Sequence, residues 1–161
     1  MIGREFLHIE SQPAFDDLVT QLAGAPILAV DTEAASFHRY RDRIYLVQLS
    51  TRALTAVVDP LAVSDLTGLG RLLVDPAVET LFHDADYDLR TLNRDYGFSG
   101  ANLFDTRIAA QLLNEPGIGL AALLEKYSAV TLDKKYQRAD WSMRPLLPGM
   151  LDYAAADTRF L

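Results

Sequence analysis

The sequence predicts a mixed α/β fold, in which a single five-stranded sheet carries helices on its faces. Two apolar runs, residues 44–50 and 55–59, are joined by the short link 51–54, which indicates an antiparallel hairpin. Farther along the chain, short apolar runs alternate with segments of helical periodicity. Antiparallel strands followed by strand–helix alternation are typical of a mixed sheet flanked by helices.

Each element has a local signal. Apolar runs predict five strands, at residues 25–30, 44–50, 55–59, 78–82 and 102–104. Apolar spacing and helix-start signals predict helices at residues 64–73, 84–96, 105–113, 120–127 and 148–161. Asp84 and Asp105 stand where helix N-caps are expected, and Pro148 suits the first turn of the last helix. The 161 residues contain no repeat or linker, so we expect one domain.

The composition limits the classes of function. The formal net charge of −7 argues against passive binding of nucleic acid through a broad basic surface. It is compatible with nucleic acid if some carboxylates hold divalent cations, which invert the local field. No apolar run approaches the ~20 residues of a membrane span, and the first residues lack the pattern of a signal peptide. The absence of cysteine excludes disulfides and leads us to expect a cytoplasmic protein.

Asp31-Thr32-Glu33 is the first candidate motif for chemistry. It follows an apolar strand, and residues two apart in a strand point to the same side. Asp31 and Glu33 are therefore expected to present two carboxylates together. A short acidic pair after a strand is also common in solvated loops, so this motif needs support from others.

Two further motifs supply that support. In residues 83–88, a helix start explains Asp84 and Asp86 but leaves Asp88, one turn on, available for chemistry. Tyr153 and Asp157 are four residues apart and share one helix face. The alternative for this pair is a helix packed tightly through its alanines, with Tyr153 in the core and Asp157 solvated.

Four carboxylates, those of Asp31, Glu33, Asp88 and Asp157, could thus gather in one place. They would repel one another strongly unless cations were bound among them. Hard oxygen ligands suit Mg²⁺ or Mn²⁺. Two such ions roughly 4 Å apart can activate water and stabilise the leaving oxygen in phosphodiester cleavage.

In this combination the sequence resembles the DEDD exonuclease superfamily, and within it the ribonuclease D branch, in which a tyrosine accompanies the last aspartate. The three motifs described above match in order. Segments between and after them also follow the family's order; they are residues 46–49, 104–106, 119–124, 132–134, 137, 140–142 and 144–146.

The resemblance implies a ribonuclease H-like fold and hydrolysis of single-stranded RNA from its 3′ end, with release of nucleoside 5′-monophosphates. It implies that Asp31 bridges two divalent ions, Mg²⁺ or Mn²⁺. Glu33 and Asp157 would complete one ion site, Asp88 would hold the second ion, and Tyr153 would orient the attacking water. Precursors of tRNA are one candidate class of substrate.

Five residues are the candidates for substrate contacts: Thr32, Phe37, Tyr40, His83 and Gln137. Residues 38–43 interleave aromatic and basic side chains next to Glu33, a composition that can stack on bases and bind phosphates. His83 could instead be a satisfied polar residue at the end of its strand. Gln137 is a candidate through the family resemblance.

Two alternatives to an exoribonuclease stay open. The first keeps the chemistry and changes the substrate to DNA. The second is a non-catalytic domain that binds nucleic acid or protein; the presence of all four carboxylates and Tyr153 disfavours it. Because the chain stops soon after Asp157, we expect residues 1–161 to form one exonuclease domain without a further C-terminal RNA-binding helical domain.

Overall fold

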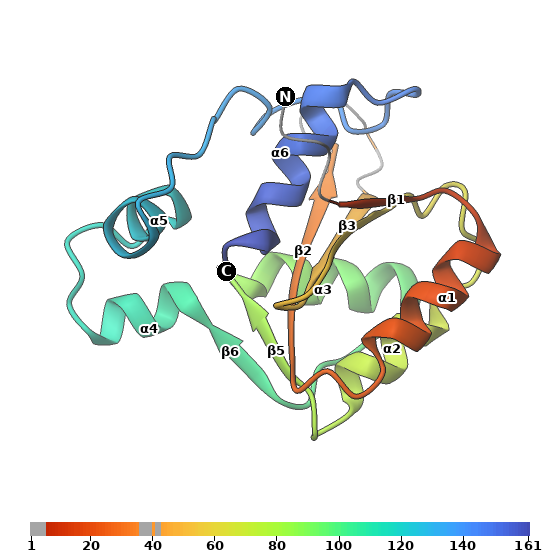
Figure 1. Cartoon of the computed structure of the whole chain (residues 1–161), viewed down its shortest axis with the longest axis horizontal. Coiled ribbons are helices and arrows are strands. Elements are labelled where there is room, and N and C mark those ends of the chain that lie inside the picture. Colours follow the sequence, from red (N-terminus) through yellow and green to blue (C-terminus); the bar gives the residue numbers. More distant parts are fainter. Residues whose placement is uncertain (1–5, 36–39, 41–42) are drawn as a thin grey trace.

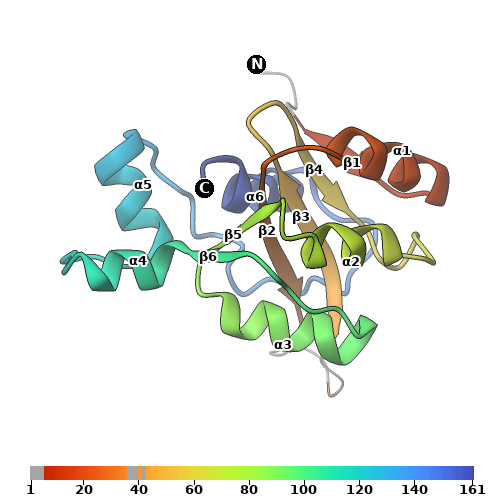
Figure 2. The same cartoon turned by 90° about the horizontal axis from the view of Figure 1, so that it is seen from below.

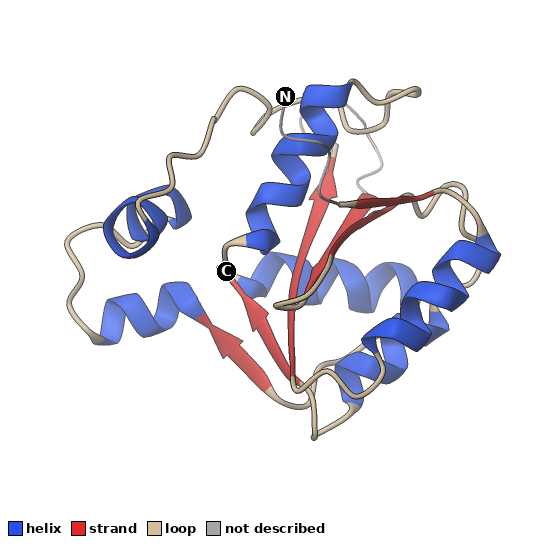
Figure 3. Ribbon diagram, in the orientation of Figure 1, coloured by secondary structure: helices blue, strands red, loops and turns tan. Residues whose placement is uncertain are grey.

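The computed structural model describes residues 6–35, 40 and 43–161, and its centre is a six-stranded mixed sheet (Figures 1 and 3). The strands are β1 (Leu7–Ile9), β2 (Ile27–Ala34), β3 (Ile44–Ser50), β4 (Thr55–Val58), β5 (Glu79–Phe82) and β6 (Leu103–Asp105). They lie in the order β1-β4-β3-β2-β5-β6, and β3 alone runs antiparallel to its neighbours.

Helices cover both faces of the sheet. They are α1 (Gln12–Leu22), α2 (Thr67–Val74), α3 (Ala85–Tyr96), α4 (Thr106–Leu112), α5 (Leu120–Ser128) and α6 (Pro148–Arg159). Helices α1, α2 and α3 pack on one face, and α6 packs on the other (Figure 2). Helices α4 and α5 extend outward beyond the β6 edge (Figure 1). Because β3 is covered on both sides, all seven of its residues are buried, as its nearly continuous apolar sequence requires.

The mixed α/β architecture predicted from the sequence is confirmed, but the sheet has one strand more than the five predicted. The additional strand, β1, has only three residues, too few for a periodic signal, and it pairs in parallel with β4. The sequence analysis also missed α1, whose Phe15, Leu18 and Leu22 are buried in the core. Strand β2 continues to Ala34, so Asp31 and Glu33 lie within a strand rather than after it.

Helix α6 approaches the sheet closely where its inward face carries two alanines. Ala154 and Ala155 are buried against Leu46 of β3 and Val57 of β4. Near the end of the helix, the hydroxyls of Thr158 and Ser50 lie 2.8 Å apart in a buried hydrogen bond. Together these contacts place the face that carries Tyr153 and Asp157 beside the end of β2.

Asp105 caps two helices at once. Its carboxylate accepts hydrogen bonds from the backbone amides of Arg107 and Ile108 at the start of α4, and from those of Asp84 and Ala85 at the start of α3. Burial by itself raises the pKa of Asp105, but these four hydrogen bonds outweigh burial and the pKa lies below its ordinary value.

The prediction that the Asp84 side chain caps α3 is wrong. Asp84 occupies the N-cap position, but its backbone is left-handed, with φ of 70°, and its side chain makes no capping hydrogen bond. It pairs instead with Arg107 of α4. The amides at the start of α3 are satisfied by a carboxylate 20 residues away in sequence, which local spacing could not reveal.

We expect Asp105→Ala to lower the free energy of unfolding by about 2 kcal/mol, because it leaves backbone amides at two helix starts without their acceptor. Urea unfolding followed by circular dichroism measures this loss. The matched control Asp84→Asn keeps a residue that tolerates the left-handed backbone and removes only an exposed ion pair, so its effect should be much smaller. Equal losses for the two variants would contradict the double-cap role.

Candidate active site

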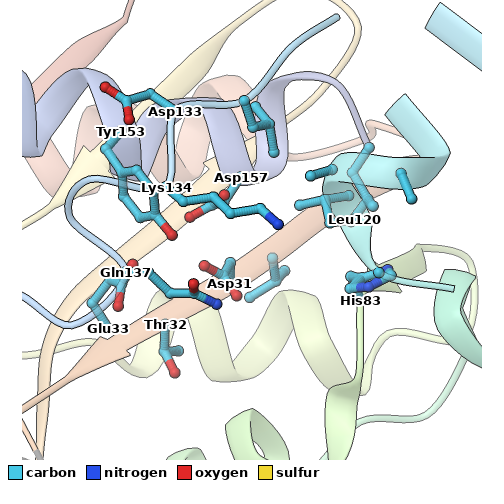
Figure 4. A pocket seen from close by; sticks show the side chains of 16 residues that line it. Asp31, Thr32, Glu33, His83, Leu120, Asp133, Lys134, Gln137, Tyr153 and Asp157 are labelled. Carbon is cyan, nitrogen blue, oxygen red and sulfur yellow. The ribbon is translucent and has the colours of Figure 1, made fainter. Parts of the chain in front are cut away.

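Three carboxylates meet where β2 passes beneath α6. Asp31 and Glu33 point to the same side of β2, and Asp157 reaches them from α6, one helical turn after Tyr153 (Figure 4). Carboxylate oxygens of Asp31, Glu33 and Asp157 all lie within 4.8 Å of one another. The predicted gathering of these three side chains is therefore observed.

Asp88 stands apart from this group and is held by Thr32. Its Oδ1 accepts hydrogen bonds from the Thr32 backbone amide at 3.1 Å and from the Thr32 hydroxyl at 2.5 Å. Thr32 lies between Asp31 and Glu33, so this contact ties the start of α3 to the strand that carries the other two carboxylates. Asp88 is close enough for its charge to raise the pKa of both Asp31 and Glu33.

Burial and mutual repulsion both oppose charge in this cluster. Burial, followed by the charges of Asp88 and Asp157, holds the pKa of Asp31 well above its ordinary value. The pKa of Glu33 is raised by burial and then by its neighbouring carboxylates. Burial raises the pKa of Asp157 to about 7. Burial also raises that of Asp88 to about 6, although the hydrogen bonds from Thr32 act in the opposite direction.

This donor set fits divalent cations. The oxygens are hard ligands, they are close enough to share an ion, and cationic charge among them would remove the repulsion that raises their pKa values. Among the described residues, this is the one group of three or more acidic or histidine side chains with such spacing.

Tyr153 lies at the edge of the cluster, with its hydroxyl directed toward the carboxylates (Figure 4). Its half-buried ring packs edge-on to Tyr136, with ring centroids 6.4 Å apart, and lies 6.0 Å from the ring of Trp141. Burial, followed by the charges of Asp157, Glu33 and Asp31, raises the pKa of Tyr153 far above its usual value. Its hydroxyl therefore keeps its proton and is available as a hydrogen-bond donor.

A pocket of about 410 Å³ opens over these carboxylates. Its walls include His83 at the end of β5, Gly119 to Ala122 at the start of α5, and residues 132–134 and 137. Gln137 therefore lies where the sequence analysis expected a substrate contact. The pocket also includes Lys134, which the sequence analysis noted only within a segment that follows the family's order; its side chain extends over the pocket (Figure 4).

His83 is observed as a hydrogen-bonded polar residue, one of the two roles considered for it, and it also lines the pocket. Its Nδ1 lies 2.9 Å from the Thr106 hydroxyl, which itself donates to the Phe82 carbonyl at 3.1 Å. Because that hydroxyl proton is already used, Nδ1 of His83 must be the donor in their contact, and Nε2 carries the free lone pair. Burial lowers the pKa of His83, so the neutral ring lines the pocket.

The other predicted substrate contacts have different positions. Thr32 borders the pocket, but its hydroxyl is bound to Asp88. Tyr40 is fully exposed and does not line this pocket. Phe37 lies outside the described residues.

The fold and the carboxylate site together define a nuclease class. A family model described as 3′-5′ exonuclease matches residues 7–161, and the chain belongs to this family. The family depends on divalent metal ions, in agreement with the carboxylate cluster.

Particular relatives are known in curated sequences and in solved structures. The chain is 40% identical to mouse exosome complex component 10 over 164 residues, which cover 99% of this chain and 18% of the relative. It is 35% identical to the catalytic core of RRP6 from Trypanosoma brucei, with a TM-score of 0.94 over 100% of this chain and 45% of that one. It is 33% identical to Escherichia coli RNase D, with a TM-score of 0.90 over 96% of this chain and 42% of that one.

These similarities confirm the ribonuclease H-like fold and the resemblance to ribonuclease D. The chain spans about a fifth of the length of the curated relatives it matches. No helix in the described part of the chain is both long and apolar enough to cross a membrane.

The expectation of a cytoplasmic protein is wrong as stated. The mouse relative is named an exosome complex component and the yeast relative an exosome complex exonuclease, and an expectation of the cytoplasm alone conflicts with these relatives. The physical reason for the error is that the absence of cysteine separates reducing from oxidising compartments. It carries no information about which reducing compartment holds the protein.

We expect the cation-free protein to become less stable as the pH rises from about 4 to about 7, because Asp88 and Asp157 keep protons in the folded state that the unfolded chain has lost. Asp157→Asn removes the part of this pH-dependent loss of stability that comes from Asp157. In chelator, its melting temperature should approach that of the parent near pH 5 and exceed it at pH 8.

The matched control for this experiment is Asp152→Asn, at an exposed position of the same helix. It should follow the parent across the pH range. A difference between Asp157→Asn and the parent that stays constant from pH 5 to pH 8 would contradict the raised pKa of Asp157.

Proposed function

We propose that this domain is a divalent-cation-dependent 3′→5′ exoribonuclease that releases nucleoside 5′-monophosphates from single-stranded RNA. The observation that carries the proposal is the trio of carboxylates within 4.8 Å of one another, at the base of a pocket that Tyr153 also lines. The pocket contains neutral and basic side chains as well, so a phosphate can approach the acidic base once cations are bound there.

The residues that would hold the cations are Asp31, Glu33 and Asp157, with Asp88 contributing from behind Thr32. We propose Mg²⁺ or Mn²⁺, in two sites, because all the ligands are hard oxygens. When bound, such ions lower the pKa of water and offset the charge that develops on the leaving oxygen. The chain therefore has no need of a strong protein base at this site.

The side chains of the chain itself supply orientation. Tyr153 keeps its proton, so its hydroxyl can donate a hydrogen bond to the attacking water or to the phosphate. Across the pocket, the free Nε2 of His83 can accept a hydrogen bond from the terminal nucleotide. Lys134 and Gln137 lie on a third wall, where an ammonium and an amide suit a phosphate and a base edge.

Similarity supports RNA as the substrate. The E. coli RNase D structure is described as that of an exoribonuclease involved in structured RNA processing, and it shares the fold over 96% of this chain. The yeast relative, at 35% identity, is named an exosome complex exonuclease. We also propose that residues 7–161 carry the catalytic site, since the family model spans them and a solved catalytic core, of which this chain covers 45%, shares their fold.

We expect the protein to shorten single-stranded RNA stepwise from its 3′ end with Mg²⁺ or Mn²⁺ and to be inactive in chelator. Asp31→Ala should lower the rate by at least about a thousandfold, because a shared cation ligand is lost. Electrophoresis of RNA labelled at its 5′ end measures this, with Asp152→Ala as the matched control. Matched single-stranded DNA tests the substrate, and faster cleavage of DNA than of RNA would contradict the exoribonuclease assignment.

We expect Tyr153→Phe to reduce kcat by roughly ten- to a hundredfold, because it removes one oriented donor while leaving the cation ligands in place. The affinity for Mn²⁺, measured by calorimetry, should stay within about twofold of that of the parent. Tyr127→Phe, at an exposed tyrosine of α5, is the control and should be as active as the parent. Unchanged kcat in Tyr153→Phe would remove the hydroxyl from the mechanism.

A further inference from the structure

We propose that the ion pair between Asp59 and Arg144 positions Tyr153 for catalysis by holding Trp141 against the tyrosine ring. This inference rests on the proposed function, in which the Tyr153 hydroxyl is an oriented donor. It assigns a role to residues 140–146, which follow the family's order but do not line the pocket over the carboxylates.

Arg144 acts as a clamp, because all three nitrogens of its guanidinium group donate hydrogen bonds. Nε and Nη2 donate to the two carboxylate oxygens of Asp59, at 2.6 and 2.9 Å. Nη2 also donates to the Tyr45 carbonyl of β3 at 2.9 Å. Nη1 donates to the carbonyls of Trp141 and Met143, at 2.8 and 2.7 Å. One side chain thus joins the end of β4, strand β3 and the backbone on both sides of Ser142.

Local turns shape the backbone of the clamped segment; the Trp141 amide, for example, donates to the Ala139 carbonyl at 3.1 Å. Residues 129–147, between α5 and α6, contain neither helix nor strand. Asp59 itself is nearly fully buried, and its Oδ1 also accepts from the Leu61 amide at 2.8 Å, so the anchor on the sheet side is rigid. Arg144 therefore links the backbone at Trp141 directly to the sheet.

Trp141 transmits this position to Tyr153. The indole is almost completely buried and packs with Met150, Leu151 and Ala154 of α6. Its ring centroid lies 6.0 Å from that of Tyr153. Because α6 is fixed by its buried alanines, the remaining freedom of Tyr153 is rotation of its side chain. Contacts with the rings of Trp141 and Tyr136 restrict that rotation.

The planar fork of arginine is what this clamp requires. Lysine has the same charge but cannot donate to both oxygens of Asp59 and to three carbonyls in fixed directions. Arg144→Lys therefore loosens the segment while keeping a positive charge beside the buried Asp59. Asp59→Asn loosens it from the opposite side and serves as the second variant if Arg144→Lys does not fold.

The test combines Arg144→Lys with Tyr153→Phe in a double-mutant cycle on single-stranded RNA with Mn²⁺. Arg144→Lys should lower kcat about tenfold in the parent, with KM and Mn²⁺ affinity within about twofold. In the Tyr153→Phe background, the same change should lower kcat less than about twofold, because the hydroxyl it positions is already absent. Arg90→Lys, at the exposed Arg90–Asp86 pair of α3, is the matched control and should have no effect.

A second measurement is independent of activity. Trp141 is the only tryptophan, so its indole protons are assigned without ambiguity in an NMR spectrum. Nuclear Overhauser cross-peaks between the rings of Trp141 and Tyr153 should be present in the parent and in Arg90→Lys. They should weaken in Arg144→Lys and in Asp59→Asn.

Two results would overturn the inference: the same fold-decrease in kcat from Arg144→Lys in both backgrounds, or unchanged cross-peaks in both clamp variants. If the folded parent fails to cleave RNA at all, the proposed function fails, and the cross-peaks alone then decide whether Arg144 holds Trp141 against Tyr153. If the parent is active and the variants match it, the clamp fails and the exonuclease assignment stands.

Discussion

The structure depends on one electrostatic constraint, the close approach of carboxylates that are partly withdrawn from water. Oxygens of Asp31, Glu33 and Asp157 lie within 4.8 Å of one another. Burial raises the pKa of all three, and repulsion from neighbouring carboxylates raises the pKa of Asp31 and Glu33 further. Such a group is unfavourable in isolation and becomes favourable when cations are bound within it. The rest of the fold must therefore hold these side chains together at a cost, which is the expected arrangement for a site that takes its charge balance from a cofactor.

Three elements, β2, α6 and α3, hold these carboxylates together. Strand β2 pairs with β3, where Asp31 lies opposite Gln48 and Glu33 opposite Leu46, and this pairing fixes the backbone of both acidic residues. Helix α6 lies close to the sheet through Ala154 and Ala155, which brings Asp157 within reach. Helix α3 is positioned at its start by the carboxylate of Asp105, so that Asp88 meets Thr32 on the far side of β2.

Local signals explain why much of this could be predicted. Long apolar runs marked β2 and β3, and the spacing of Tyr153 and Asp157 placed both on one face of α6. The short strand β1 was not predicted, because its three residues form a strand by pairing with β4 and have no periodic pattern of their own. The capping of α3 was assigned to Asp84 for a similar reason, since only the fold brings Asp105 to that helix start.

The sequence by itself determined which residue types could do the chemistry and the order of the main elements, because periodicity and strand spacing act over a few residues. The tertiary structure decided which residues contact one another. Asp88 is bound by Thr32 from 56 residues away, and Asp59 meets Arg144 across 85 residues. It also brought Lys134 to the pocket and left Tyr40 exposed. Such contacts are set by how helices and strands pack, and packing depends on the whole chain at once.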